Sequence, residues 1–198
     1  MLTIGITGGV GSGKSEVLSF LEKEYGVVCI RTDLVARSLI SAGGRCFDET
    51  AALFGPEVIG EDGEFDRSRI AEIVFREKEK LEKLNSITHP AVKEEVKSLI
   101  RKAEKEGKKY LFLESALLLE EKYDEICDEL WYVYAEAGVR EQRLMSGRGY
   151  SAEKIRSIMA NQLSEEVFSE ACDFILDNSG TFEETKKKII EKMSGYNK

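Results

Sequence analysis

The sequence predicts an α/β fold: a five-stranded parallel sheet with helices on both of its faces. Five short apolar runs alternate with longer stretches that have the period of a helix, which is the order of elements in a parallel α/β sheet. Most of these runs are continuously apolar, as expected for strands that helices cover on both sides. The strands are expected at Leu2–Thr7, Val27–Thr32, Tyr110–Leu113, Leu130–Ala135 and Phe174–Leu176.

The composition is that of one globular domain, residues 1–198. With 42% hydrophobic and 33% charged residues, the chain is long enough for one buried core. Its net charge of −8 argues against a nucleic-acid-binding face, because neutralising phosphates needs clustered lysine and arginine. There is no basic leader and no apolar run of about eighteen residues. We therefore expect a cytoplasmic protein that does not span a membrane, and no obligate protein partner is evident.

Two insertions interrupt the alternation of strands and helices. The first, residues 41–107, carries apolar residues at three- and four-residue spacing, which predicts a helical cap. Its expected helices are Arg69–Phe75, Glu77–Asn85 and Pro90–Glu106. The second, residues 138–169, is polar, rich in arginine and broken by Gly147 and Gly149. We expect this segment to form a lid, in which Ser151 caps the N-terminus of a helix.

Residues Gly8–Ser15 match the pattern G-x-x-x-x-G-K-S, which is the phosphate-binding P-loop. An apolar run precedes them and the helix-forming stretch Glu16–Glu24 follows. Glycines are required because the backbone must curl around phosphate oxygens and present its N–H groups to them. The following helix adds the positive end of its dipole. The alternative is a glycine-rich turn without a ligand, which rarely places Gly-Lys-Ser at this offset and in this context.

Two side chains of the loop have predicted roles. Lys14 is expected to reach the β- and γ-phosphates of a nucleotide, and the Ser15 hydroxyl to complete the shell of a Mg²⁺ ion. The Asn/Thr-Lys-x-Asp signal of guanine-specific switches is missing near the fourth and fifth strands. Glu114 ends the third strand, where it either orients magnesium-bound waters or faces solvent, and the sequence leaves both open.

Asp33 lies at the carboxyl end of the second predicted strand, the rim where open α/β sheets bind ligands. A carboxylate there can accept a proton from an attacking hydroxyl. Arg37, one helical turn later, can hold an acceptor phosphate. Asp33 can instead cap the N-terminus of the following helix.

Further motifs follow in order along the chain. They are His89-Pro90, Leu117–Glu120, Arg140–Arg143 with Arg148, Asn161-Gln162 and Leu176–Gly180. Together with the P-loop and the Asp33 segment, they resemble the dephospho-coenzyme A kinase family over essentially the whole chain. The resemblance implies transfer of the ATP γ-phosphoryl group to the ribose 3′-hydroxyl of dephospho-coenzyme A, with Mg²⁺. It also implies a P-loop fold with a helical substrate-binding insertion and a lid.

The resemblance also implies roles for individual residues. Asp33 is the base, Lys14 and Arg140 stabilise the transferring phosphoryl group, and Arg143 contributes from the lid. The implied ATP-binding residues are Gly9, Gly11, Ser12, Gly13, Lys14, Ser15, Glu16, Arg148, Asn178 and Gly180. The implied substrate-binding residues are Thr7, Asp33, Arg37, His89 and Leu118, and Ser15 is the metal ligand.

The chain departs from the family pattern at three places. Glu16 replaces a threonine whose backbone N–H does the binding, and Glu114-Ser115-Ala116 replaces Asp-Val-Pro. Arg140 stands where the family often has glutamine, so Arg143 competes with it as the main phosphate contact. His89, the only histidine, either contacts substrate or simply precedes and caps the helix that starts at Pro90.

Two other functions compete with this reading. One is a kinase of the same architecture that phosphorylates a nucleoside monophosphate. The other is a nucleotide-dependent switch or binding protein with no acceptor, which would leave Asp33 and the lid arginines idle. The aromatic group Trp131, Tyr132 and Tyr134 favours strand core over a stacking platform.

Overall fold

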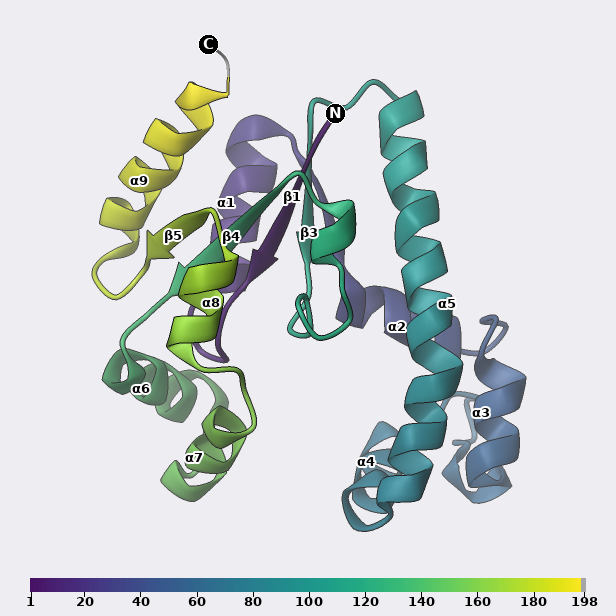
Figure 1. Cartoon of the computed structure of the whole chain (residues 1–198). Coiled ribbons are helices and arrows are strands. Elements are labelled where there is room, and N and C mark those ends of the chain that lie inside the picture. Colours follow the sequence, from purple (N-terminus) through teal and green to yellow (C-terminus); the bar gives the residue numbers. More distant parts are fainter. Residues whose placement is uncertain (197–198) are drawn as a thin grey trace. The chain divides into compact units, whose positions relative to one another are not determined.

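Five parallel strands build the sheet that carries the phosphate loop (Figure 1). The computed structural model describes residues 1–196, which fold as two units. The sheet unit comprises residues 1–29 and the chain from Glu106 onward, and the helical unit comprises Ile30–Lys105. Strand order in the sheet is β2-β3-β1-β4-β5. The strands are β1 (Leu2–Thr7), β2 (Val28–Arg31), β3 (Tyr110–Glu114), β4 (Glu129–Tyr134) and β5 (Phe174–Asp177).

All five predicted strands are confirmed, each with ends within two residues of the expected ones. The parallel register places Ile4 beside Phe112, and Ile6 beside Trp131. The sheet unit also contains helices that follow or precede these strands. They are α1 (Lys14–Tyr25), the 3₁₀ turn η2 (Asp124–Ile126), α6 (Ala137–Arg148), α7 (Ala152–Ala160), α8 (Glu165–Ala171) and α9 (Phe182–Gly195).

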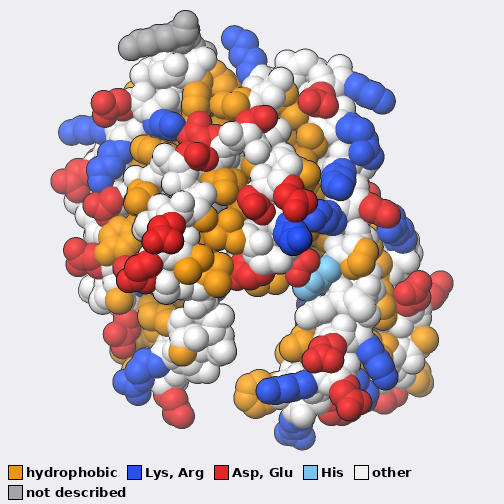
Figure 2. Space-filling model, viewed as in Figure 1, with side chains coloured by type: hydrophobic (Ala, Val, Ile, Leu, Met, Phe, Trp, Pro, Cys, Tyr) orange, Lys and Arg blue, Asp and Glu red, His pale blue; other side chains and the backbone are white. Residues whose placement is uncertain are grey.

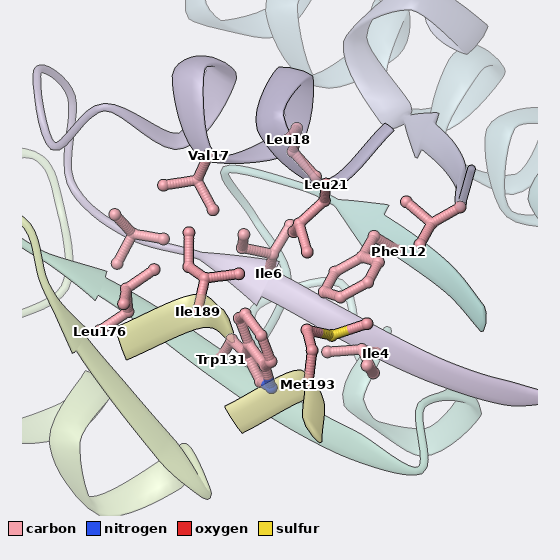
Figure 3. Close-up of a cluster of buried hydrophobic side chains, with 12 residues drawn as sticks. Ile4, Ile6, Val17, Leu18, Leu21, Phe112, Trp131, Leu176, Ile189 and Met193 are labelled. Atoms are coloured by element: carbon pink, nitrogen blue, oxygen red, sulfur yellow. The ribbon is translucent and has the colours of Figure 1, made fainter. Parts of the chain in front are cut away.

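The main core lies on the sheet face that α1 and α9 cover (Figure 3). Its buried side chains from the strands and these two helices include Ile4, Ile6, Val17, Leu18, Leu21, Phe112, Trp131, Leu176, Ile189 and Met193. The opposite face is covered in part by α8, whose Phe168 stacks on Tyr132 with ring centroids 5.1 Å apart. Trp131 and Tyr132 are buried in the sheet, which confirms their interpretation as strand core, whereas Tyr134 at the end of β4 is half-buried.

The helical unit has a small core of its own. Its elements are α2 (Thr32–Ile40), α3 (Phe47–Phe54), η1 (Pro56–Val58), α4 (Arg67–Arg76) and α5 (Lys78–Lys105). Phe54, Val58, Phe65 and Ile70 are buried together, and the ring of Phe47 stacks on Phe65 at 4.7 Å. The helix α3 has no counterpart among the helices that the sequence predicted.

The expected break before Pro90 is wrong, because α5 runs unbroken through this proline. Proline removes one helical hydrogen bond and crowds the preceding turn. Here the helix packs on α2, α3 and α4, and it buries Thr88, Ala91 and Val92 around the proline. Tertiary burial on both sides of Pro90 thus outweighs a local cost. His89 consequently lies in the helix interior, so its interpretation as a helix cap is also wrong.

The arginine-rich segment is more helical than its glycines suggested. Gly147 lies inside α6, so the predicted break at this residue is wrong. Gly149 does end the helix, in the left-handed conformation (φ 63°) that glycine adopts without strain. The Ser151 hydroxyl accepts a hydrogen bond from the backbone N–H of Lys154 at 3.2 Å, which confirms Ser151 as the N-cap of α7.

The surface mixes charges of both signs. Figure 2 shows acidic and basic side chains interspersed over the visible face. On this face, neither acidic nor basic side chains gather in one large patch. Within residues 1–196, no helix has both the length and the apolar character that crossing a membrane requires.

Candidate active site

The loop between β1 and α1 has the glycine geometry that its sequence predicts. Gly11 and Gly13 have φ angles of 81° and 94°, which residues with a Cβ rarely adopt. A Cβ at Gly9 would collide with the guanidinium of Arg140, and one at Gly13 with the side-chain amide of Asn178. The close approach of these side chains shows that the loop is held from outside as well as by its own bends.

Lys14 lies against the carbonyl groups of its own loop. Its Nζ donates to Gly8 O at 2.6 Å and to Gly9 O at 3.3 Å. Burial lowers the pKa of Lys14, while the carboxylate of Glu114 raises it and the guanidinium of Arg148 lowers it further. Glu114 is half-buried at the end of β3 and acts on the loop lysine, so it is not simply a strand-end charge in solvent. An anion bound in the loop would favour the charged lysine.

Arg140 fixes the middle of the loop. This residue is 8% exposed, and its Nε donates to Val10 O at 3.0 Å. Its Nη2 donates to Gln162 Oε1 at 2.9 Å, and the same oxygen accepts from the Val10 N–H at 3.2 Å. Its Nη1 lies 3.9 Å from Glu165 Oε1. Arg140 therefore binds the backbone of the phosphate loop instead of standing free for a phosphate.

Arg143 and Asn178 hold the last carbonyl group of the loop. Asn178 is fully buried, and its Nδ2 donates to Ser12 O at 2.8 Å while its Oδ1 accepts from Thr185 Oγ1 at 2.7 Å. Arg143 donates through Nη2 to Asn178 O at 2.9 Å and through Nη1 to Ser12 O at 3.5 Å. The loop is thus connected to the end of β5 and to α9, where Gly180 precedes the helix.

These contacts leave a set of backbone donors for a ligand. Among residues 1–196, the N–H groups of Gly11, Gly13, Lys14 and Ser15 have no protein acceptor. They stand at the N-terminus of α1, where the helix dipole favours an anion. The Glu16 N–H, which was also assigned to ATP, instead donates to Gly13 O at 3.0 Å. The backbone donors available to a phosphate therefore come from the loop and the first two residues of α1.

The hydroxyl group of Ser15 in the loop can act as a ligand for a metal ion. Ser15 is exposed in the first turn of α1, and its hydroxyl has no hydrogen-bond partner in the described part of the chain. Across residues 1–196, no group of three or more His, Cys, Asp or Glu side chains is placed to hold a metal. Mg²⁺ at kinase sites is bound mainly by phosphates and water with one or two protein oxygens. The residues present therefore fit Mg²⁺ that arrives with a nucleotide.

Three predicted site residues lie in the helical unit. α2 begins at Thr32 with Arg31 as its N-cap residue, so the interpretation of Asp33 as the cap is wrong. The carboxylate of Asp33 is exposed in the first turn, and Arg37 is exposed one turn later. His89 lies within α5, well along the chain from both.

Two other predicted residues are buried in the sheet unit. The Thr7 hydroxyl and the Ser12 hydroxyl have no hydrogen-bond partner and no exposed surface among the described residues. Leu118 is fully buried beneath Gly5, where a Cβ would collide with it. The Leu118 side chain is therefore core in this structure and does not face a ligand.

A P-loop of this form after the central strand of a five-stranded parallel sheet defines a P-loop nucleotide-binding protein. The family model described as dephospho-CoA kinase matches residues 2–184 of the chain. A dephospho-CoA kinase of Carboxydothermus hydrogenoformans is 36% identical over 187 residues, which are 94% of this chain and 90% of the relative. One from Corynebacterium glutamicum is 37% identical over 189 residues, 96% of each chain. The chain therefore belongs to the dephospho-CoA kinase family, and it is a kinase.

Two solved structures share the fold of this chain. A crystal structure of a Thermus thermophilus protein has a TM-score of 0.81 at 28% identity, over 98% of this chain and 97% of that one. A dephospho-CoA kinase from Campylobacter jejuni has a TM-score of 0.74 at 22% identity, over 99% and 98%, and supports the fold alone. The family-level prediction from the sequence is confirmed.

Proposed function

We propose that this protein transfers the γ-phosphoryl group of ATP to the 3′-hydroxyl of dephospho-coenzyme A, with Mg²⁺ as its cofactor. The products are coenzyme A and ADP, which is the last step of coenzyme A synthesis. Family membership supports the pair of substrates. The chemistry is supported above all by one observation: the loop carbonyls of Val10 and Ser12 are turned onto the side chains of Arg140 and Asn178.

This arrangement prepares the loop for phosphate. In a trans peptide group the C=O and the N–H point in opposite directions. A carbonyl group held on the protein side of the loop therefore turns the N–H of the same peptide toward the ligand side. The donors are in place before the nucleotide arrives, so they need no reorganisation when charge develops on the phosphoryl oxygens. Positioning and charge stabilisation account for most of the catalysis in phosphoryl transfer. Bound Mg²⁺ would neutralise charge on the phosphate oxygens beside Ser15.

Among the cations, Lys14 and Arg148 suit direct contact with the transferring group. Lys14 is held by two carbonyl groups that a phosphate can replace as partners. Arg148 is exposed, has no hydrogen-bond partner among the described residues, and acts electrostatically on Lys14. Arg140 and Arg143 are already bonded to the loop and to Asn178, so we assign them the role of holding the cradle. The proposal thus gives Lys14 and Arg148 the contacts to phosphate, and Arg140 and Arg143 the support of the loop. The sequence alone did not divide these residues in this way.

The acceptor side of the proposal rests on the helical unit and on Glu114. The carboxylate of Asp33 is exposed and does not cap a helix, so it is available to take the proton of the attacking hydroxyl. Arg37, one turn along α2, is available for an acceptor phosphate. Glu114, which acts electrostatically on Lys14, would order waters on the metal. Residues 41–107 serve as the substrate-binding insertion, and residues 138–169 as the lid.

The test is ADP formation with and without dephospho-coenzyme A. We expect ADP to accumulate steadily only when Mg²⁺, ATP and dephospho-coenzyme A are all present, with a product heavier than the acceptor by one phosphate. AMP, CMP and UMP serve as control acceptors and should react poorly. Comparable turnover of AMP would favour a nucleoside monophosphate kinase, and acceptor-independent ADP formation would favour a switch or ATPase.

A further inference from the structure

A buried chain of hydrogen bonds links the phosphate loop to α9, entirely within the sheet unit. Asn178 follows β5 and is fully buried, and Thr185 in the first turns of α9 is 1% exposed. The Thr185 hydroxyl donates to Asn178 Oδ1 at 2.7 Å, and Asn178 Nδ2 donates to Ser12 O at 2.8 Å. None of the roles assigned above belongs to Thr185, although its hydroxyl stands only one side chain away from the loop.

These bonds fix the orientation of the Asn178 side-chain amide. Ser12 O can only accept a hydrogen bond, so the NH₂ group of Asn178 must face the loop. The amide oxygen then faces Thr185, whose hydroxyl donates to it. Threonine hydroxyls inside helices often bond the carbonyl group four residues earlier. Here that group, Thr181 O, lies at the longer distance of 3.4 Å, so the hydroxyl bonds Asn178 in preference to its own helix.

Asn178 acts on one peptide group of the phosphate loop, the one that joins Ser12 to Gly13. Because the C=O and the N–H of a trans peptide point in opposite directions, the bond to Ser12 O sets the direction of the Gly13 N–H. This N–H has no protein acceptor among residues 1–196, so it is available to a phosphate. A Cβ at Gly13 would collide with the Asn178 amide, which shows how closely the two residues approach. The position of Asn178 therefore bears on one of the phosphate donors.

The helix that carries Thr185 is fixed at both of its ends. At its start, Thr181 and Glu184 form a reciprocal capping box. At its end, the Tyr196 hydroxyl donates to Glu129 Oε2 of β4 at 2.7 Å. Between these points, the apolar face of α9 packs into the main core against the sheet (Figure 3). The Thr185 hydroxyl therefore has a defined place relative to the strands that carry the loop and Asn178.

We propose that Thr185 is a positioning residue for the phosphate loop, which it orients through Asn178 so that the Gly13 N–H faces the nucleotide phosphates. Without the hydroxyl, the buried amide oxygen of Asn178 loses its donor, which disfavours the bound position of the amide. Arg143 Nη1 also donates to Ser12 O, at the longer distance of 3.5 Å, so the loop keeps a weaker support. Thr185 therefore tunes the affinity for nucleotide and is not essential for binding.

The experiment measures binding of Mg-ADP by calorimetry in two pairs of chains that differ by this hydroxyl alone. The unmodified chain and Thr185→Val differ at nearly constant shape, and Thr185→Ser and Thr185→Ala differ at a constant loss of the methyl group. We expect Kd to rise about fivefold within each pair, the scale of one neutral hydrogen bond. Thr185→Ser, which keeps the donor, should bind Mg-ADP nearly as well as the unmodified chain. The inference rests on the nucleotide-binding part of the proposed function and is independent of the acceptor.

Two controls separate positioning from a general loosening of α9. Ile189→Val removes a methylene group from the core, one turn further along the same buried face of the helix. It should lower the melting temperature and leave Kd for Mg-ADP unchanged. A double-variant cycle with Asn178→Ala tests the route of the effect, because residues that act through one another are not additive. In the Asn178→Ala background, Thr185→Val should have no further effect on Kd.

Equal Kd values within both pairs would overturn the proposal and leave the proposed function standing. A rise in Kd for Ile189→Val as large as that for Thr185→Val would also overturn it, because affinity would then follow the stability of α9. An undiminished effect of Thr185→Val in the Asn178→Ala background would show that Thr185 does not act through Asn178, which contradicts the proposed route. If the unmodified chain does not bind Mg-ADP at all, the proposed function falls, and this inference falls with it.

Discussion

Lys14→Met removes the ammonium group of the loop lysine and keeps most of its apolar stem. In the proposed reaction this ammonium meets charge that spreads over the γ-phosphoryl oxygens in a site with little water. Removing one preorganised donor of this kind costs about 10²–10³-fold in kcat, or roughly 2.7–4 kcal/mol. We expect a loss of this size, with folding intact.

The same change is expected to stabilise the protein in the absence of nucleotide. Burial lowers the pKa of Lys14 below the ordinary lysine value of 10.5, so the folded state disfavours the charged form despite the two carbonyl partners. Between the lowered pKa and 10.5, the unfolded chain binds more protons than the folded chain, and wild-type stability therefore rises with pH in this window. The melting temperature of Lys14→Met should exceed that of wild type at neutral pH, and the gap should narrow as the pH approaches 10.5.

The assay combines steady-state ADP formation with thermal unfolding at about pH 7 and about pH 9.5, with and without Mg-ATP. Lys23→Met is the matched control, because Lys23 is an exposed lysine in the last turn of the same helix. It should leave turnover unchanged. Turnover of Lys14→Met near the wild-type value would refute the catalytic role. A melting temperature several degrees below wild type would refute the argument from burial.

Two further predictions concern the acceptor base and the lid. Asp33→Asn should fold normally, because the carboxylate is exposed and caps no helix, and it should lose about a hundredfold in kcat with KM for ATP unchanged. Wild-type turnover in this variant would place the base elsewhere. Amide exchange across residues 149–161 should slow when Mg-ATP and an unreactive acceptor analogue bind together, relative to the control helix α9. Equal exchange in the free and bound states would contradict a closing lid in this segment.

The strands could be predicted because the signal, a short apolar run, lies within each strand and recurs in every strand of the sheet. Each strand is a short apolar run, and burial on both faces makes that run continuous. The helix boundary at Pro90 was predicted wrongly because the prediction used only the residues next to the proline, whereas the course of the helix depends on tertiary packing. The helix continues because Ala91 and Val92 are buried, and neither the neighbouring helices nor their contacts can be seen in the residues around the proline.

At the site, the role of Arg140 could not be predicted from sequence motifs. The P-loop pattern locates backbone donors, since only a glycine-rich turn before a helix curls in this way. A curled loop also has carbonyl groups that need partners, because buried backbone groups are almost always hydrogen-bonded. Arg140 meets that need at Val10, 130 positions away, and Gln162 holds Arg140 from the turn that follows α7. An arginine near a P-loop can be assigned to phosphate only if the loop carbonyl groups do not already use its guanidinium as their donor. Arg140 is used in this way and Arg148 is not, so Arg148 is the stronger candidate for a phosphate contact.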